Sequence, residues 1–280
     1  PLTGNESNLL VPVAVNNLLF AGSLWVTCLA AGRLAGRLGF EPLLGATVAA
    51  VLAVSFGPDI WLGYSALAEP IYILLTLLSS YLFLERLRSL SLPVELGLVG
   101  MLAAAAHYLG WFLAAFCAGF VLVRWWLEGG FKGRLLVGLV LCGLFPALWL
   151  VENWRHWGEP LHFLRLAAAY QAPYAGSLDP AGRLLLLANG LAAGVGILGL
   201  VGLVGAAAVA VRCPEAVRYL LPGCWLMATL LLTTALGLSN PGQEPRYLVI
   251  FGWVLIPLLG AWISGLLMGR GIGRRTLALI

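Results

Sequence analysis

The sequence predicts an all-α membrane protein, built as a polytopic bundle of transmembrane helices. Of its 280 residues 61% are hydrophobic and only 10% are charged, and the mean hydropathy is +0.96. A soluble domain has about 25% charged residues, so this chain cannot bury its apolar side chains in one water-soluble core. Residues 1–280 are expected to form a single transmembrane domain. The net charge of +4 is spread over short loops, which argues against a nucleic-acid partner.

Nine apolar runs separated by polar loops predict the helices. In chain order the runs span residues 10–32, 43–57, 62–84, 94–107, 109–127, 134–151, 184–211, 218–238 and 247–268. A helix needs about 20 residues to cross the bilayer. The second and fourth runs are shorter, so their helices are expected to be tilted, half-buried or re-entrant.

Positive charge is distributed unevenly over the loops, and this predicts the orientation. One set of alternate loops holds twelve Lys and Arg residues and the other set holds four. Loops rich in Lys and Arg stay on the inner side of a membrane, so we expect an outer N-terminus, an inner C-terminus and nine passes. The inner set is Arg33, Arg37, Arg86, Arg88, Arg124, Lys132, Arg134, Arg212, Arg218, Arg270, Arg274 and Arg275, and the outer set is Arg155, Arg165, Arg183 and Arg246.

The one long loop, 152–183, falls on the outer face and is rich in Trp, Tyr and His. Aromatic rings at this level form the interfacial belt of membrane proteins. They also suit stacking against the apolar faces of sugars. We favour the belt and keep the sugar contact as the alternative.

Two patterns resemble ligand sites but lack the right context. Gly194, Gly196 and Gly199 match GxGxxG, yet they lie inside an apolar run and follow no strand, so a dinucleotide site is not indicated. We expect these glycines, like Gly32 and Gly36, to let helices pack closely. The same run also contains Gly190, Gly202 and Gly205.

Metal sites are not indicated by the histidines or the cysteines. His156, Glu159 and His162 have the composition of a zinc cluster, but their spacing turns the outer pair roughly 120° apart on a helix, and Pro160 disrupts a helix interior. We interpret them as interface residues. The five cysteines form no CxxC pair, so neither a disulfide framework nor a zinc site is predicted.

Glu69 lies just inside the third apolar run and is followed by Pro70. Proline is favoured at the first helical position and an anion is favoured at a helix N-terminus, so Glu69 suits a helix cap. Charges at the edge of apolar spans are costly to bury and usually mark a polar cavity. Ligand binding is therefore the second interpretation, and the two are compatible.

Arg246 and Tyr247 open the last run, after a polar stretch that includes Gln243 and Glu244. A helix N-terminus attracts anions, and Arg adds a bidentate fork that suits phosphate. The alternatives are a salt bridge with Glu244 or an interfacial anchor. We favour phosphate contact because the helix dipole and the guanidinium act at one point.

His107 and Tyr108 follow four alanines at the outer turn between two short runs. His107 is either a buried histidine whose hydrogen bonds are satisfied within the fold or a hydrogen-bond donor to a phosphate or sugar.

The order of these features resembles the polytopic GT-C glycosyltransferases. Residues 66–77 resemble the family's SEP stretch, and residues 97–110 resemble its GLLAGLAALTRYEG block, with His107 where many members carry Arg. Residues 153–163 are similar to its N-x-x-x-G-x-P-x-x-F stretch, and residues 245–247 match its late RY at a helix start.

The resemblance covers residues 10–260 and implies a membrane glycosyltransferase that uses a polyprenyl-phosphate sugar. The enzyme would move mannose or a similar hexose to a lipid, glycan or protein acceptor on the periplasmic face of a bacterial plasma membrane or the lumenal face of a eukaryotic ER membrane. The implied substrate-binding residues are Glu69, His107, Tyr108, Gln243, Arg246 and Tyr247.

The catalytic residue is not assigned, because the family's acidic residue lies in the first outer loop, which is expected upstream of Pro1 together with the first helix. This chain alone is then expected to be inactive. Sugar transfer needs a base that deprotonates the acceptor hydroxyl, directly or through a divalent metal ion. Arg246, alone or with His107, would stabilise the departing phosphate.

Two other classes of function remain open. A transporter or flippase of lipid-linked intermediates would show internal repeats and broken helices at mid-membrane, whereas the polar residues here cluster at one face and no repeat is evident. A non-catalytic assembly subunit is the second alternative.

Overall fold

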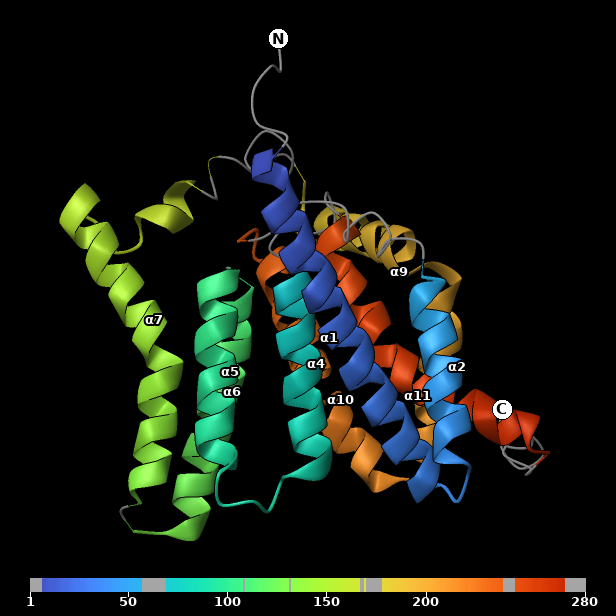
Figure 1. The fold of residues 1–280 in the computed structure, drawn as a ribbon. Coiled ribbons are helices and arrows are strands. Elements are labelled where there is room, and N and C mark those ends of the chain that lie inside the picture. Colours follow the sequence, from blue (N-terminus) through green and yellow to red (C-terminus); the bar gives the residue numbers. More distant parts are fainter. Residues whose placement is uncertain are drawn as a thin grey trace. The chain divides into compact units, whose positions relative to one another are not determined.

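The structure is a computed structural model that describes residues 7–56, 69–107, 109–130, 132–166, 169, 178–238 and 245–269 (Figure 1). Every regular element in this part of the chain is a helix, which confirms the predicted all-α class. The elements are α1 (Ser7–Arg37), α2 (Pro42–Val54), α4 (Glu69–Glu85), α5 (Leu92–Ala106), α6 (Gly110–Glu128), α7 (Gly133–Trp157), α9 (Pro180–Ala210), α10 (Pro214–Ala235), the 3₁₀ helix η2 (Pro245–Leu248) and α11 (Val249–Leu267).

Six of these helices, α1, α6, α7, α9, α10 and α11, are long and apolar enough to cross a membrane. The chain is therefore a multi-pass integral membrane protein, as its composition predicts. The helices α2 and α5 span only 13 and 15 residues, so the expected shortness of the second and fourth runs is confirmed. Each apolar run corresponds to a helix in the described residues, while the number of passes stays a prediction.

The chain divides into two compact units. Unit 1 comprises Pro1–Leu84, Gly194–Leu221 and Arg246–Ile280, and unit 2 comprises Glu85–Ala193 and Pro222–Pro245. The chain passes from one unit to the other at several points, and two of these points lie at or near residues that disturb a helix. Gly196 has non-helical backbone angles within α9, and Pro222 lies inside α10.

In unit 1 the helices α1, α2 and α11 pack through small residues. A Cβ atom added to Gly32 would lie 3.2 Å from the carbonyl oxygen of Pro42, and one added to Gly45 would lie 2.7 Å from Cβ of Ala35. The close contact expected at Gly32 and Gly36 is therefore confirmed as the α1–α2 contact. Gly260 brings α11 equally close to α2 at Ala49.

The glycines of α9 serve two different purposes. Gly202 and Gly205 lie against Leu255 and Leu259 of α11, with added Cβ atoms 3.0 and 3.3 Å from the nearest side-chain atoms, as close packing predicts. Gly196 does not take part in close packing, because an added Cβ would meet nothing within 4 Å. Its backbone adopts φ 58° and ψ −148°. The packing role expected for Gly196 was wrong, because its glycine permits a backbone conformation that other residues rarely adopt.

One end of unit 1 carries its basic residues, and we call it the basic end of unit 1. Nη1 of Arg37 at the end of α1 donates to the carbonyl oxygen of Leu84 at 3.3 Å, and the N–H of Glu41 lies 3.4 Å from Sδ of Met268. These contacts place the C-termini of α1, α4 and α11 together. A buried cluster that includes Leu34, Leu84, Val209, Cys213, Ala216 and Tyr219 adds the α9–α10 junction to this end.

In unit 2 the helices α5, α6 and α7 pack against one another, and α6 runs antiparallel to the other two (Figure 1). Gly97 of α5 approaches the backbone of Gly138 of α7, where an added Cβ would lie 2.7 Å from the carbonyl oxygen. Gly100 makes a similar approach to Ala114 of α6. The loop before α5, the end of α6 and the start of α7 carry Arg86, Arg88, Arg124, Lys132 and Arg134, and we call this the basic end of unit 2.

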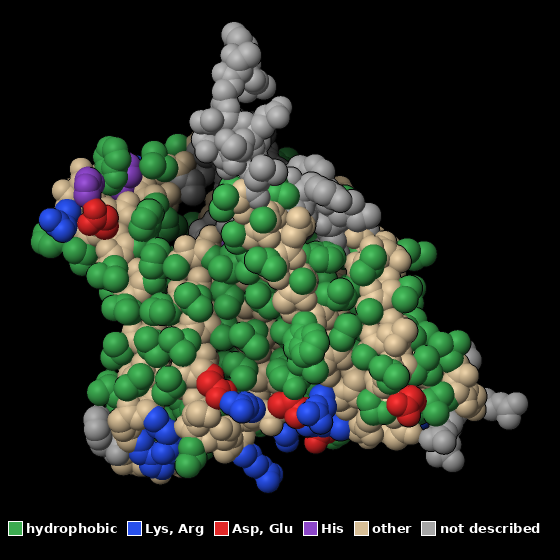
Figure 2. Space-filling view, viewed as in Figure 1, with side chains coloured by type: hydrophobic (Ala, Val, Ile, Leu, Met, Phe, Trp, Pro, Cys, Tyr) green, Lys and Arg blue, Asp and Glu red, His purple; other side chains and the backbone are tan. Residues whose placement is uncertain are grey.

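The loop predicted at 152–183 begins later in the structure, because α7 continues to Trp157. Apolarity ends at Val151, but helix-compatible residues follow, and Glu152 pairs with Arg155 and His156 along the same helix. The helix stops at Gly158, whose φ of 71° is the left-handed C-terminal cap. The space-filling view shows hydrophobic side chains covering the helix flanks and charged side chains gathered at helix ends (Figure 2).

Candidate functional site

Glu69 is the first described residue of α4, and only 5% of its surface is exposed. Its neighbour Pro70 is buried as well. Burying a carboxylate in an apolar protein costs several kcal/mol unless polar groups compensate for lost water. A carboxylate in this position is therefore a default candidate for function in a membrane protein.

Tyr247 lies at the same end of unit 1 as Glu69. Both α4 and α11 run toward the basic end, so their first turns lie at the opposite end. The 3₁₀ helix η2 leads directly into α11 and contains the partly buried Tyr247 and the backbone of Arg246. The side chain of Arg246 lies outside the described part of the structure, as do Tyr108 and Gln243. Of the predicted substrate residues, the structure therefore places Glu69 and Tyr247 at one end of one unit.

Buried polar side chains continue from this end into α1 and α4. Asn16, Ser23 and Thr27 are buried on α1, and Tyr72, Thr76, Ser79 and Ser80 are buried on α4. Thr76 and Ser79 donate to carbonyl oxygens of their own helix at 3.0 and 2.7 Å. In contrast, Oγ1 of Thr27 and Oγ of Ser80 are buried with no hydrogen-bond partner among the described residues.

His107 belongs to unit 2 and closes the turn between α5 and α6. Its backbone N–H donates to Ala103, and its Nδ1 accepts the N–H of Leu109 at 3.1 Å. The turn also depends on Gly110, where a Cβ atom would overlap the backbone of Ala103. Because Nδ1 accepts a hydrogen bond, the neutral ring carries its own proton on Nε2. Any donation to a ligand would come from Nε2.

The aromatic and histidine residues after α7 form a compact elbow, residues 158–166. His162 is buried and stacks on Trp157 with ring centroids 4.7 Å apart, while its Nδ1 lies 3.1 Å from Nη2 of Arg165. Arg165 also donates to Oε1 of Glu159 at 2.8 Å.

Both histidines of this region, His156 and His162, contact side chains of neighbouring residues. His156 pairs with Glu152 at 3.1 Å and takes no part in the contacts of the elbow. Within the described ranges, no group of three or more His, Cys, Asp and Glu residues is arranged to hold a metal ion. Phe163 of the elbow packs on Trp111 of α6 with ring centroids 5.1 Å apart, so the elbow contacts α6 within unit 2.

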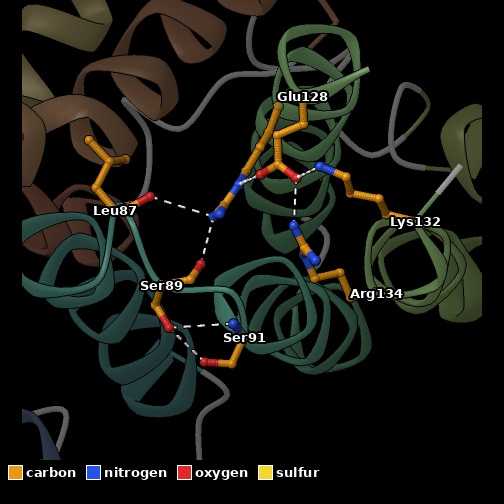
Figure 3. Close-up of polar contacts among 7 residues, drawn as sticks. Leu87, Ser89, Ser91, Glu128, Lys132 and Arg134 are labelled. Carbon is orange, nitrogen blue, oxygen red and sulfur yellow. Dashed lines mark hydrogen bonds and ion pairs between the residues drawn. The ribbon is translucent and has the colours of Figure 1, made fainter. Parts of the chain in front are cut away.

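A second polar cluster lies at the basic end of unit 2, and it is not among the residues that the sequence predicts for a site. Glu128, the last residue of α6, contacts Arg124, Lys132 and Arg134 (Figure 3). The feature of the sequence that could have predicted this cluster is the spacing of Arg124, Glu128 and Lys132 at i, i+4 and i+8. That spacing aligns opposite charges on one helix face, although a loop separates Lys132 from α6.

Comparison with known proteins gives no relative: no protein family, no curated protein and no solved structure matches this chain. Functional inference therefore rests on the residues and their geometry.

Proposed function

We propose that the protein is a membrane glycosyltransferase of the GT-C type, which moves mannose or a similar hexose from a polyprenyl-phosphate donor to a lipid, glycan or protein acceptor. The observation that carries the proposal is the buried carboxylate of Glu69 at the end of unit 1 opposite the basic end. The 3₁₀ helix η2, which contains Tyr247 and leads into α11, lies at the same end and includes the short stretch that resembles the family's RY motif.

In the proposed reaction, the residues at the start of α4 and at the start of α11 have different roles. A polyprenyl-phosphate sugar brings one phosphate, whose negative charge grows as the sugar leaves. The N-terminus of α11 supplies a favourable dipole for that charge, and Arg246, one residue before Tyr247, would supply the guanidinium fork. Glu69 would hydrogen-bond the hydroxyls of the sugar. A divalent metal ion, if the enzyme uses one, would assist the base that deprotonates the acceptor.

Arg246 gives a specific test of the donor contact. Arg246→Lys keeps the charge but loses the fork, so we expect impaired sugar transfer, and Arg246→Ala should be more severely impaired. The assay uses the full-length protein with a purified polyprenyl-phosphate sugar and measures donor binding in parallel. If both variants bind donor and transfer sugar as the wild type does, Arg246 is an interfacial anchor.

The second candidate is a transporter or flippase of lipid-linked intermediates, and one observation favours it. The apolar helix α9 is interrupted at Gly196 by non-helical backbone angles. Broken helices of this kind form substrate sites in transporters. Reconstituted vesicles separate the two functions, because a flippase moves a labelled polyprenyl-phosphate sugar across the bilayer without transferring the sugar. Movement without transfer would replace the glycosyltransferase proposal.

A further inference from the structure

Three cationic side chains share a single carboxylate at the basic end of unit 2. Nε of Arg124 lies 2.5 Å from Oε1 of Glu128, while Nζ of Lys132 and Nη2 of Arg134 lie 2.8 and 2.5 Å from Oε2. Figure 3 shows Lys132 and Arg134 reaching the carboxylate of Glu128 from the following segment of chain. Three positive charges and one negative charge leave the cluster with an excess of two positive charges.

The three cations are not equivalent. Arg124 also donates to the carbonyl oxygens of Ser89 and Leu87, at 2.8 and 3.5 Å, and its side chain is only 12% exposed, so it joins the α4–α5 loop to α6. Lys132 and Arg134 are 34% and 29% exposed, and within the described residues their side chains pair with Glu128 alone. Nε of Arg134 is buried with no hydrogen-bond partner in that part of the chain. The excess charge thus resides on two side chains that solvent or a ligand can reach.

An exposed apolar strip runs along α7 next to this cluster. Leu136, Val137 and Val140 are exposed on the first turns of α7, directly after Arg134. The exposed Leu122, Val123 and Trp126 of α6 lie on the face of that helix turned away from Arg124 and Glu128, because each residue turns a helix by about 100°. A positively charged cluster at the end of an apolar helix flank is complementary to a lipid that has an anionic headgroup and acyl chains.

We propose that Lys132 and Arg134 bind the phosphate of an anionic phospholipid, whose acyl chains lie along the exposed strip of α7. A basic cluster next to a transmembrane helix attracts anionic headgroups, and a desolvated phosphate accepts charge-assisted hydrogen bonds from Lys and Arg. Glu128 offsets part of the charge of the two cations. This site is independent of the glycosyltransferase proposal, because it uses none of the predicted substrate residues.

The test measures lipid binding to the purified protein by native mass spectrometry, with phosphatidylglycerol as the anionic probe and phosphatidylcholine as the neutral one. Each basic residue near a lipid surface contributes about fivefold in affinity, so Lys132→Gln with Arg134→Gln should weaken phosphatidylglycerol binding by about thirtyfold. The matched control, Arg86→Gln with Arg88→Gln, removes the same charge at the same end and should change binding by less than about twofold. Equal losses in both pairs would overturn the site.

Glu128→Gln separates lipid binding from a purely structural ion-pair network. Removing the carboxylate raises the excess charge of the cluster from two to three and leaves Lys132 and Arg134 without the carboxylate that they contact. An anion site should then bind phosphatidylglycerol about fivefold more tightly. Unchanged or weaker binding by folded protein would overturn the proposal. If the double variant does not fold, Lys132→Gln alone supplies the expected fivefold loss.

Inorganic phosphate identifies the source of the anion. If the occupant is a phospholipid, inorganic phosphate should not displace bound phosphatidylglycerol at comparable concentration, because the acyl chains add affinity that free phosphate lacks. Displacement by equimolar phosphate would show a site for soluble phosphate and reject the lipid.

Discussion

At the scale of single residues, the turn between α5 and α6 depends on Gly110. The chain reverses there within a few residues, and His107 fixes the turn by accepting the N–H of Leu109. A side chain on Gly110 would occupy the space of the Ala103 backbone, and a backbone carbonyl cannot swing aside as a flexible side chain can.

Gly110→Ala should therefore destabilise the protein by about 1–3 kcal/mol or more. Gly119 on the same helix is the control, because an added Cβ there meets nothing within 4 Å. Gly119→Ala should be neutral or slightly stabilising, since Ala favours helix over Gly by about 1 kcal/mol. Thermal unfolding of both purified variants in one detergent makes the comparison. Equal melting temperatures would show that the α5–α6 turn is not as tight as described.

Glu41 and Glu69 show why burial cannot be read from a local motif. Each precedes a proline at the start of a helix, and each therefore has the same signature of a helix cap. Glu41 is exposed, and its Oε1 accepts the N–H of Leu43 at 3.4 Å. Glu69 is buried. The difference comes from tertiary packing, which buries most residues of α4 and is not encoded in the dipeptide.

At the scale of helices, hydropathy predicts position well and boundaries less well. The run at 134–151 ends where polar residues begin, yet α7 continues to Trp157, because pairs such as Glu152 and His156 suit a helix in water. Hydropathy also fails to predict the break in α9. A run of Leu, Val and Gly has the same high hydropathy whether or not the helical backbone is interrupted.

Gly196→Ala tests that break. The observed φ of 58° and ψ of −148° lie in a region that is essentially restricted to glycine, so a side chain there costs on the order of 1–3 kcal/mol. Gly143 in α7 has helical geometry and open space around it, and Gly143→Ala serves as the control. We expect a lower melting temperature for Gly196→Ala alone. If the Gly196 variant melts no lower than the control, α9 is a continuous helix.

At the scale of the whole molecule, hydropathy predicts the all-α membrane class and charge predicts that Lys and Arg gather at one end. Neither predicts the division into two units. Every described member of the inner set of Lys and Arg residues lies at the basic end of its unit. The division follows from which helices pack together, and contacts such as Gly97 against Gly138 are not visible in an apolar run. The candidate site is predicted in part: Glu69 and Tyr247 share one end of unit 1, whereas His107 belongs to unit 2.

Orientation is tested by single cysteines at Glu159 and Arg88, in a background that lacks the native cysteines. Both positions are exposed and lie at opposite ends of unit 2. The 25 residues of α7 rise roughly 37 Å, enough to cross the hydrocarbon core. A membrane-impermeant maleimide should label Glu159→Cys in intact cells and Arg88→Cys only after permeabilisation. Labelling of both positions from the same side would reject the topology.

The measurement that tests the central claim most directly compares Glu69→Gln with Glu41→Gln. The two substitutions remove the same charge from the same Glu-Pro context, one at the proposed site and one at the basic end of unit 1. Sugar transfer from a polyprenyl-phosphate donor and thermal stability are measured on the same full-length preparations. We expect Glu69→Gln to lose transfer while it remains folded, and Glu41→Gln to retain transfer and to lose at most about 1 kcal/mol of stability as a weakened helix cap. Wild-type transfer by Glu69→Gln would contradict the proposed site.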